Sequence, residues 1–234
     1  MGLFLKSSCV LCNSAVSRSI SLCQSCEDDL PLLEHACKQC GLPLNSADVI
    51  DSVCGQCLKN PTAVDYTVCL YHYQVPLNHL ITELKYKQKL VYAEVLGQLL
   101  SKRVEGRVEG NAVDIPDCIL PVPLYRGRLV KRGFNQSLEI AQPVSKRLKV
   151  PIEETLARRI KKTRSQTDLD AIQRSKNMRG CFEISPKVSK SYDHVVIIDD
   201  VVTTGSTVNE LAIVLKESGV KKVGVWSIAR ATIK

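Results

Sequence analysis

Eight of the eleven cysteines form four Cys-x-x-Cys pairs within the first 57 residues. The pairs are Cys9/Cys12, Cys23/Cys26, Cys37/Cys40 and Cys54/Cys57. Eight thiolates are the complete ligand set of two tetrahedral zinc sites, and a site with four cysteine ligands is closed and therefore structural. Disulfides or an iron–sulfur cluster are the alternative uses of such cysteines. The number and spacing of the pairs favour two structural zinc ions.

The residue that follows a Cys-x-x-Cys pair indicates which pairs share a zinc ion. Asn13 follows one pair and Gly41 another, and these two residue types adopt the left-handed backbone conformation most readily. A zinc knuckle needs that turn to point backbone N–H groups at the sulfur atoms. This repeat favours Cys9, Cys12, Cys23 and Cys26 on one zinc, and Cys37, Cys40, Cys54 and Cys57 on the other; an interleaved pairing stays open. The single Cys69, Cys118 and Cys181 are expected in the core.

A second motif is the run V-V-I-I-D-D-V-V-T-T-G-S-T at residues 195–207. An apolar strand ends there in Asp199 and Asp200, and a turn rich in hydroxyls and glycine then opens a helix. Backbone N–H groups at such a helix start can bind a phosphate. The two acids would repel that phosphate, so we expect them to face neutral sugar hydroxyls. Together they describe a site for a ribose 5-phosphate; a capped helix after a core strand is the alternative.

This run resembles the phosphoribosyl diphosphate (PRPP) motif of type I phosphoribosyltransferases. The whole chain resembles the ComF/GntX family, which joins a cysteine-rich zinc module to such a domain. Two further segments carry the resemblance: V-P-L-Y-R-G-R-L-V-K-R-G-F-N-Q-S at 122–137, and R-R-I-K-K-T-R-S-Q-T at 158–167 with Arg174, Asn177 and M-R-G at 178–180 beyond.

The resemblance implies roles for individual residues. Asp199 and Asp200 would be the catalytic residues and hold the ribose 2′- and 3′-hydroxyls, with Mg²⁺ bound alongside PRPP. The 5′-phosphate would lie on Thr203, Thr204, Gly205, Ser206 and Thr207. Arg126 would contact the pyrophosphate, and residues 158–179 would form a mobile hood. Purine-salvage relatives place an acid where this chain has Thr203, which argues against a purine-salvage role.

The distribution of charge agrees with an anionic ligand. Residues 1–62 carry four Lys or Arg against six Asp or Glu, whereas the rest of the chain has a net charge of +10. Residues 126–149 and 158–179 each have a net charge of +6. Such runs suit a pyrophosphate with its magnesium ion, or the phosphate backbone of single-stranded DNA. Solvated charged faces are the alternative reading.

Two functions therefore stand side by side. The first is an enzyme that transfers a phosphoribosyl group from PRPP to an unknown acceptor, with Mg²⁺ and with pyrophosphate as the leaving group. The second is non-catalytic handling of internalised single-stranded DNA in competence or DNA utilisation, with the PRPP site as a nucleotide grip or sensor. Membrane-associated DNA-uptake proteins would then be partners. Aromatic residues make up only 5% of the chain, which gives base stacking weak support.

The chain has 234 residues, of which 44% are hydrophobic. This is enough for a folded core, so we expect regular helices and strands to position these residues. A turn signal at residues 60–62 predicts a boundary between a cysteine-rich module, 1–62, and a basic domain, 63–234. The resemblance implies that the first is a double zinc-ribbon module and the second a phosphoribosyltransferase-like domain. Apolar patterns predict strands at 64–73, 117–122, 194–198 and 222–230, and helices at 76–104, 134–148 (with a kink at Pro143) and 206–217. Gly106 and Gly110 predict a loop, and 155–182 a long flexible loop or a hairpin.

This alternation of strands and helices predicts an α/β fold with a parallel sheet covered by helices. The resemblance implies that this sheet is of the type I phosphoribosyltransferase kind and that it follows a small N-terminal cysteine-rich zinc-ribbon module. No apolar run reaches the ~18–20 residues that cross a bilayer. The opening apolar run is too short for a secretory signal. We therefore expect a cytoplasmic protein, and in a reducing compartment paired cysteines bind metal more often than they form disulfides.

Overall fold

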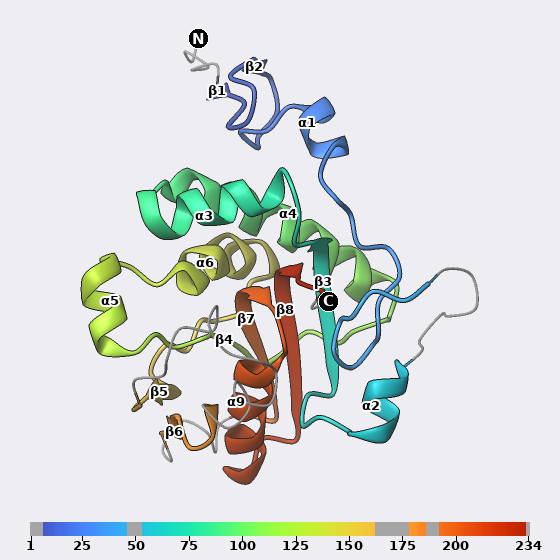
Figure 1. The fold of residues 1–234 in the computed structure, drawn as a ribbon, viewed down its shortest axis with the longest axis vertical. Helices are drawn as coiled ribbons and strands as arrows, with labels where there is room; N and C mark the ends of the chain where they lie inside the picture. Colours follow the sequence, from blue (N-terminus) through green and yellow to red (C-terminus); the bar gives the residue numbers. More distant parts are fainter. Residues whose placement is uncertain (1–6, 46–52, 162–177, 186–191, 233–234) are drawn as a thin grey trace.

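The computed structural model describes residues 7–45, 53–161, 178–185 and 192–232, and its centre is a four-stranded parallel sheet (Figure 1). The strand order is β3-β8-β7-β4. The strands are β3 (Tyr66–His72), β8 (Lys222–Arg230), β7 (His194–Val202) and β4 (Cys118–Pro121). All three strand pairings are parallel, which confirms the predicted α/β sheet.

Helices cover both faces of this sheet, and the apolar run of β7 reflects that. Val196 and Ile198 pack into the core on the side of three helices: α3 (Leu77–Lys87), α4 (Leu90–Glu109) and α6 (Gln136–Leu148). Val195 and Ile197 pack on the opposite side with α9 (Ser206–Glu217). Successive side chains of a strand point to opposite faces, so a strand buried on both must be apolar throughout.

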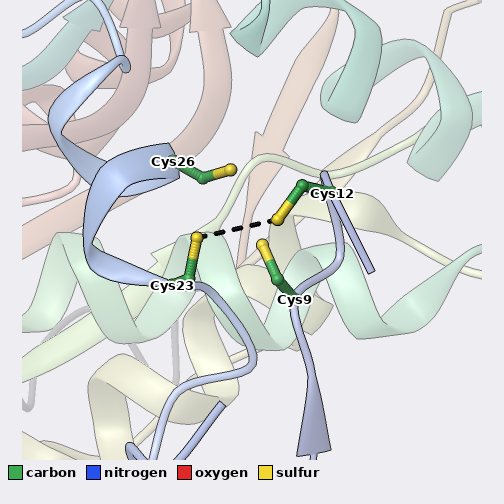
Figure 2. A group of neighbouring side chains, drawn as sticks. All are labelled: Cys9, Cys12, Cys23 and Cys26. Atoms are coloured by element: carbon green, nitrogen blue, oxygen red, sulfur yellow. Dashed lines mark hydrogen bonds between the residues drawn. The ribbon is translucent and has the colours of Figure 1, made fainter. Parts of the chain in front are cut away.

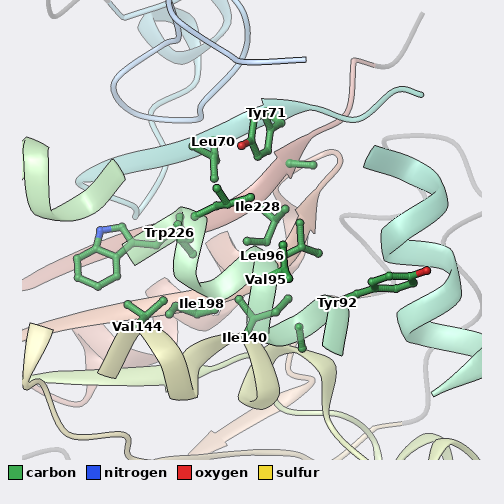
Figure 3. Packing of buried hydrophobic residues seen from close by; sticks show 14 of the residues in the cluster. Leu70, Tyr71, Tyr92, Val95, Leu96, Ile140, Val144, Ile198, Trp226 and Ile228 are labelled. Atoms are coloured by element: carbon green, nitrogen blue, oxygen red, sulfur yellow. The ribbon is translucent and has the colours of Figure 1, made fainter. Parts of the chain in front are cut away.

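The larger of the two cores lies between the sheet and helices α4 and α6. Figure 3 shows Ile198, Trp226 and Ile228 of the sheet close to Val95 and Leu96 of α4 and to Ile140 and Val144 of α6. The Trp226 side chain is fully buried there. This core fixes α3 and α4 against the strands, and α3 reaches the site described below.

The other elements of the described residues are short. The cysteine-rich segment contains β1 (Ser7–Ser8), β2 (Ala15–Val16), α1 (Gln24–Asp28) and α2 (Gly55–Lys59). After β4 comes α5 (Arg126–Arg132). β5 (Ala157–Arg159) and β6 (Phe182–Ile184) pair in an antiparallel manner, as a hairpin within 155–182 would. Arg164, Arg174 and Asn177 of the expected hood lie outside the described residues.

Two predicted boundaries are wrong. The helical pattern at 76–104 is broken, because Gln88 takes a left-handed conformation with φ of 55° and separates α3 from α4. Gly106 is not in a loop, since α4 continues to Glu109. Val104 is buried and Val108 packs against the same core, so the helix keeps an apolar face past the glycine.

The cysteine-rich segment also runs along the outer edge of β3. The Leu33 N–H donates to the Leu70 carbonyl at 3.0 Å and the His72 N–H donates to the Pro31 carbonyl at 2.8 Å. These bonds satisfy backbone groups of an edge strand that would otherwise be open. The division of the chain between residues 62 and 63 stays a prediction. Within the described residues, no helix combines the length and apolar character that crossing a membrane requires.

Candidate functional site

A cavity of about 540 Å³ lies at the carboxyl ends of the parallel strands. Tyr73 lines it directly after β3, Val122 directly after β4, and Asp199 and Asp200 lie near the end of β7. Ligands of open α/β sheets commonly bind at this edge, because loops from several strands meet there. β7 continues past the two acids to Val202, since it stays paired with β8.

Asp199 and Asp200 (the acid pair) are held by neighbours from three elements. Oδ1 of Asp199 accepts hydrogen bonds from the Ser137 hydroxyl at 3.2 Å and from the backbone N–H of Asp200 at 2.9 Å. Oδ1 of Asp200 accepts from the Gln136 amide at 3.4 Å. Its Oδ2 forms an ion pair with the Lys85 ammonium group, which reaches the cavity from α3.

The two acids differ in their tendency to ionise. Burial raises the pKa of Asp199 to about 8, and the neighbouring charge of Asp200 adds to the rise. Burial also works against ionisation of Asp200, but the Lys85 charge and hydrogen bond outweigh it and lower the pKa of Asp200. Near neutral pH the pair therefore carries close to one negative charge.

The rest of the cavity is rich in cationic side chains. Lys85, Arg128, Lys131, Arg132 and Arg159 line it, against the two carboxyl groups of the acid pair. The Arg132 guanidinium lies 5.8 Å from the centre of the Tyr86 ring and donates to the Gln136 amide oxygen. Five cations around one acid pair suit a ligand with several negative charges.

The turn at residues 203–207 follows the acid pair and opens α9. Thr203 and Thr207 line the 540 Å³ cavity. Thr204, Gly205 and Ser206 line a neighbouring cavity of about 230 Å³. Gly205 is the helix N-cap with φ of 79°, a conformation that glycine adopts without strain. The turn thus brings backbone N–H groups of a helix start to the end of β7, as the motif predicted.

Arg126 differs from the other cations of α5 because it does not line the 540 Å³ cavity. It is the exposed first residue of α5. The residues of that helix that line the 540 Å³ cavity are Arg128, Lys131 and Arg132. Arg126 and Arg128 are two residues apart, so in a helix of about 3.6 residues per turn their side chains leave on different faces.

Lys85, Tyr86 and Tyr73 also line the cavity, and none of them was predicted from the sequence as a member of the site. All three precede the motifs that carried the prediction. One signal was available for Lys85: it follows Ile81 by one helical turn, so it continues the buried face of a helix. A lysine at such a position needs an anionic partner.

The eight paired cysteines form two clusters, in the order that the repeat favoured. Cys9, Cys12, Cys23 and Cys26 make the first cluster, and Cys37, Cys40, Cys54 and Cys57 the second, each with its four Sγ atoms within 4.8 Å of one another. Figure 2 shows the first cluster, with the four side chains pointing toward a common centre. The described structure brings no interleaved set together.

The sulfur spacing fits zinc. The Sγ atoms of Cys12 and Cys23 are 3.7 Å apart, as are those of Cys40 and Cys54. A tetrahedron with Zn–S bonds of about 2.3 Å has edges of about 3.8 Å. A disulfide would need about 2.05 Å. Both clusters are therefore consistent with structural zinc.

The knuckles have the backbone that the sequence predicted. Asn13 and Gly41 take φ of 60° and 70°. The Cys54 N–H points at the Cys37 sulfur at 3.2 Å. Burial opposes ionisation of Cys9 and Cys37, but nearby backbone N–H groups outweigh it and lower their pKa values to about 6 and about 7. Such N–H groups stabilise the thiolate form that binds metal.

Comparisons with known proteins agree with the two cysteine clusters and with the site at the end of β7. Residues 1–58 match the double zinc ribbon domain family, and residues 135–232 match the phosphoribosyl transferase domain family. A solved structure, the glutamine phosphoribosylpyrophosphate (PRPP) amidotransferase from B. subtilis complexed with ADP and GMP, aligns with 58% of this chain and 25% of its own length. Its TM-score is 0.38 and its identity is 20%.

Three curated relatives match along most of their length. Competence protein F of Haemophilus influenzae is 33% identical over 97% of this chain and 99% of its own. DNA utilization protein YhgH of Escherichia coli K12 is 35% identical over 89% of this chain and 90% of its own. Competence protein ComFC of Bacillus subtilis is 22% identical over 90% and 89%. With its double zinc ribbon and phosphoribosyltransferase fold, this chain belongs to the ComF family.

Proposed function

We propose that the chain binds PRPP, or a closely related phosphoribosyl ligand, in the 540 Å³ cavity. The acid pair would accept hydrogen bonds from the ribose 2′- and 3′-hydroxyls. Backbone N–H groups and hydroxyls of residues 203–207 would hold the 5′-phosphate. One observation carries the proposal: an acid pair, with Asp200 buried and Asp199 half-buried, is followed by a helix-opening turn at the end of β7, beside a cavity lined by five cations.

The cations suit the pyrophosphate end of such a ligand. Arg128, Lys131 and Arg132 line the cavity from α5, and Arg126 begins the same helix and remains a proposed contact. Carboxylate oxygens and phosphates are the ligands that Mg²⁺ prefers, so the acid pair fits an ion that arrives with PRPP. When bound, Mg²⁺ would neutralise part of the pyrophosphate charge.

A phosphoribosyl transfer would break the bond between ribose C1 and the pyrophosphate oxygen. The electron pair of that bond leaves with the pyrophosphate, and the acceptor supplies the pair for the new bond to C1. The cations of α5 would stabilise the charge that develops on the leaving group. Positioning of the sugar by the acid pair would supply much of the remaining effect. Thr203 in place of an acid argues against a purine acceptor.

Binding can be tested by isothermal titration calorimetry with PRPP and Mg²⁺. We expect the wild-type protein to bind, and Asp199→Asn with Asp200→Asn to lose most of the affinity, because the hydroxyls lose the negative charge that the acid pair shares as their acceptor. Asp28→Asn with Asp29→Asn is a matched control, since these adjacent acids are exposed and line neither cavity. Equal affinity in all three proteins would contradict the proposal. A separate assay of pyrophosphate release from PRPP then distinguishes catalytic turnover from binding alone.

A second function, the handling of single-stranded DNA, is favoured by the surface of α5. Arg126, Arg128 and Lys131 are all exposed along it, and two of them also line the cavity. Relatives of the chain are named for competence and DNA utilization. In this function the cavity would grip or sense a nucleotide, and the protein would work in the cytoplasm beside membrane-associated DNA-uptake proteins.

Salt dependence distinguishes this second function. If α5 follows a phosphate backbone, Arg128→Ala with Lys131→Ala should weaken binding of any single-stranded sequence and reduce the salt slope by about one unit per lost contact. Lys59→Ala with Lys102→Ala is the control, because these exposed lysines lie on α2 and α4, outside both basic runs, and line neither cavity. Equal loss in both variants would contradict a role for α5. If PRPP competes with single-stranded DNA for binding, a nucleotide of the DNA would occupy the 540 Å³ cavity.

A further inference from the structure

Arg230, the last residue of β8, is a buried arginine whose guanidinium donates to four backbone carbonyl groups. Its Nη1 donates to Val202 at 3.1 Å, to Thr203 and to Ala231 at 2.7 Å. Its Nε donates to the carbonyl of Cys40 at 2.9 Å. Only 3% of the residue is exposed. One side chain thus joins the start of the turn to a cysteine of the second cluster.

The zinc knuckle at residues 37–41, which contains Cys40, packs closely against β3. Thr67 donates from its backbone N–H to the Lys38 carbonyl at 2.7 Å, and from its hydroxyl to the Gln39 carbonyl at 2.7 Å. A Cβ on Gly41 would lie 2.8 Å from the sulfur of Cys69 and 2.9 Å from a methyl carbon of Thr67. With the four thiolates of the second cluster gathered, the knuckle therefore lies directly against the strand and presents the Cys40 carbonyl to Arg230.

The knuckle and the turn also face each other across the 230 Å³ cavity. Gln39 and Cys40 line it from the knuckle, and Thr204, Gly205 and Ser206 line it from the turn. The wall that backs the proposed phosphate turn is thus built in part from a zinc-ribbon loop.

We propose that Arg230 is a positioning residue through which zinc in the second cluster strengthens the binding of a phosphoribosyl ligand. The inference rests on the proposed function of the turn. Four thiolates on one ion fix the knuckle, and that constraint is lost without the metal. Arg230 then loses one of its fixed acceptors, and the Val202 and Thr203 carbonyls are held less firmly. A turn that is less preorganised binds its phosphate more weakly.

The first cluster provides the matched comparison. Cys9 is buried in the core that includes α3 and α4, and Cys23 and Cys26 pack against that core. Among the described residues, no cysteine of this cluster lines either cavity. Loss of zinc from the first cluster should therefore leave the turn undisturbed.

A double-mutant cycle on the full-length protein tests the link. The probes are ribose 5-phosphate and PRPP with Mg²⁺, measured by calorimetry, with zinc content determined for each variant. Cys54→Ser should lose one zinc ion and bind roughly tenfold more weakly. Arg230→Met should bind more weakly to a similar degree, and the double variant no more weakly than Arg230→Met alone. Cys23→Ser should also lose one zinc yet keep its affinity within about twofold.

Three outcomes would overturn the inference: additive effects of Cys54→Ser and Arg230→Met, equal weakening by Cys23→Ser, or full affinity in Cys54→Ser. Arg230→Lys keeps the charge but cannot span separated carbonyls as a guanidinium does, so it should resemble Arg230→Met. If Arg230→Met does not fold, the cycle is run with Arg230→Lys.

Failure of the proposed function can be told apart from failure of this inference. If the wild-type protein binds neither probe, amide hydrogen exchange of residues 203–207 becomes the readout. We then expect faster exchange in Cys54→Ser than in Cys23→Ser. Equal exchange in the two variants would overturn the link between the second cluster and the turn.

Discussion

The ammonium group of Lys85, on α3, forms an ion pair with Oδ2 of Asp200, on β7, and both residues line the cavity. The exposed fractions of the side chains are 22% and 4%. Lys85 lies on α3, before the residues 135–232 that match the phosphoribosyl transferase domain family. The acid pair of this chain is therefore neutralised in part by a residue from outside that matched segment.

Removal of the Lys85 charge should destabilise the fold, because it leaves the Asp200 carboxylate buried without its cation. We expect Lys85→Met to lower the free energy of unfolding by about 3 kcal/mol, as measured by urea denaturation. Adding Asp200→Asn should recover more than half of the loss. Lys87→Met is the control: its side chain is 66% exposed and pairs with Glu83, so a change below about 1 kcal/mol is expected. Lack of recovery in the double variant would contradict the ion-pair argument.

Two glycines of α4 should respond to alanine in opposite directions. A Cβ on Gly97 would lie 2.6 Å from the Ile140 carbonyl oxygen of α6, whereas a Cβ on Gly106 would meet nothing within 4 Å. Gly97→Ala should therefore cost about 2 kcal/mol of stability by forcing the two helices apart. Gly106→Ala should gain about 0.5–1 kcal/mol from helix propensity. Urea unfolding measures both, and similar effects would contradict the close helix contact.

The parts that the sequence predicted well are local. The run from β7 through the turn to α9 combines a strand signal, a turn and a helix start within a few residues, and both ends of α9 match the prediction. The grouping of the cysteines also followed from local signals, the left-handed residues Asn13 and Gly41. In each case neighbours in the sequence fix the conformation, so distant contacts were not needed.

The parts that the sequence did not reveal depend on distant contacts. Lys85 enters the site because α3 packs on α4, and Gln88 breaks the helix just beyond it. Arg230 ends a strand pattern that predicts only a buried or half-buried position. Its role comes from carbonyls of Cys40 and Thr203, which only the folded chain brings together. The spacing of apolar residues along the sequence carries no information about which distant residues come into contact.

The raised pKa of Asp199 predicts a specific dependence of stability on pH. An aspartate in the unfolded chain releases its proton near pH 4, whereas Asp199 in the fold keeps its proton up to about pH 8. Between these values the folded state binds more protons from this group, so its contribution to stability falls as pH rises. The slope cannot exceed about 1.4 kcal/mol per pH unit.

The comparison that isolates this group is wild type against Asp199→Asn, by urea unfolding between about pH 5 and pH 9. We expect the free energy of unfolding of wild type to fall relative to the variant as pH increases. Asp193→Asn is the control, because Asp193 is exposed and pairs with Lys221 at the surface. A difference between wild type and Asp199→Asn that does not vary with pH would contradict the shifted pKa.

The two cysteine clusters should bind two zinc ions per chain, and the pairing should show in single variants. Cys37→Ser should reduce the zinc content from two ions to one by opening the second cluster, and Cys9→Ser should do the same to the first, because each cluster draws all four ligands from its own half of the segment. The Cys37→Ser protein combined with Cys57→Ser should still hold one zinc ion. The double variant Cys9→Ser with Cys37→Ser should hold none.

Elemental analysis of freshly purified, chelator-free protein measures these numbers. Cys118→Ser is the control, because Cys118 is a buried residue of β4 outside both clusters, and it should keep two ions. The critical variant is Cys37→Ser with Cys57→Ser. If clusters shared ligands between the two halves, removal of two cysteines from the second half would empty both sites. One zinc ion in that variant supports closed, separate sites, since each four-cysteine site is complete without the other. No zinc in it would contradict the pairing that the sulfur positions indicate.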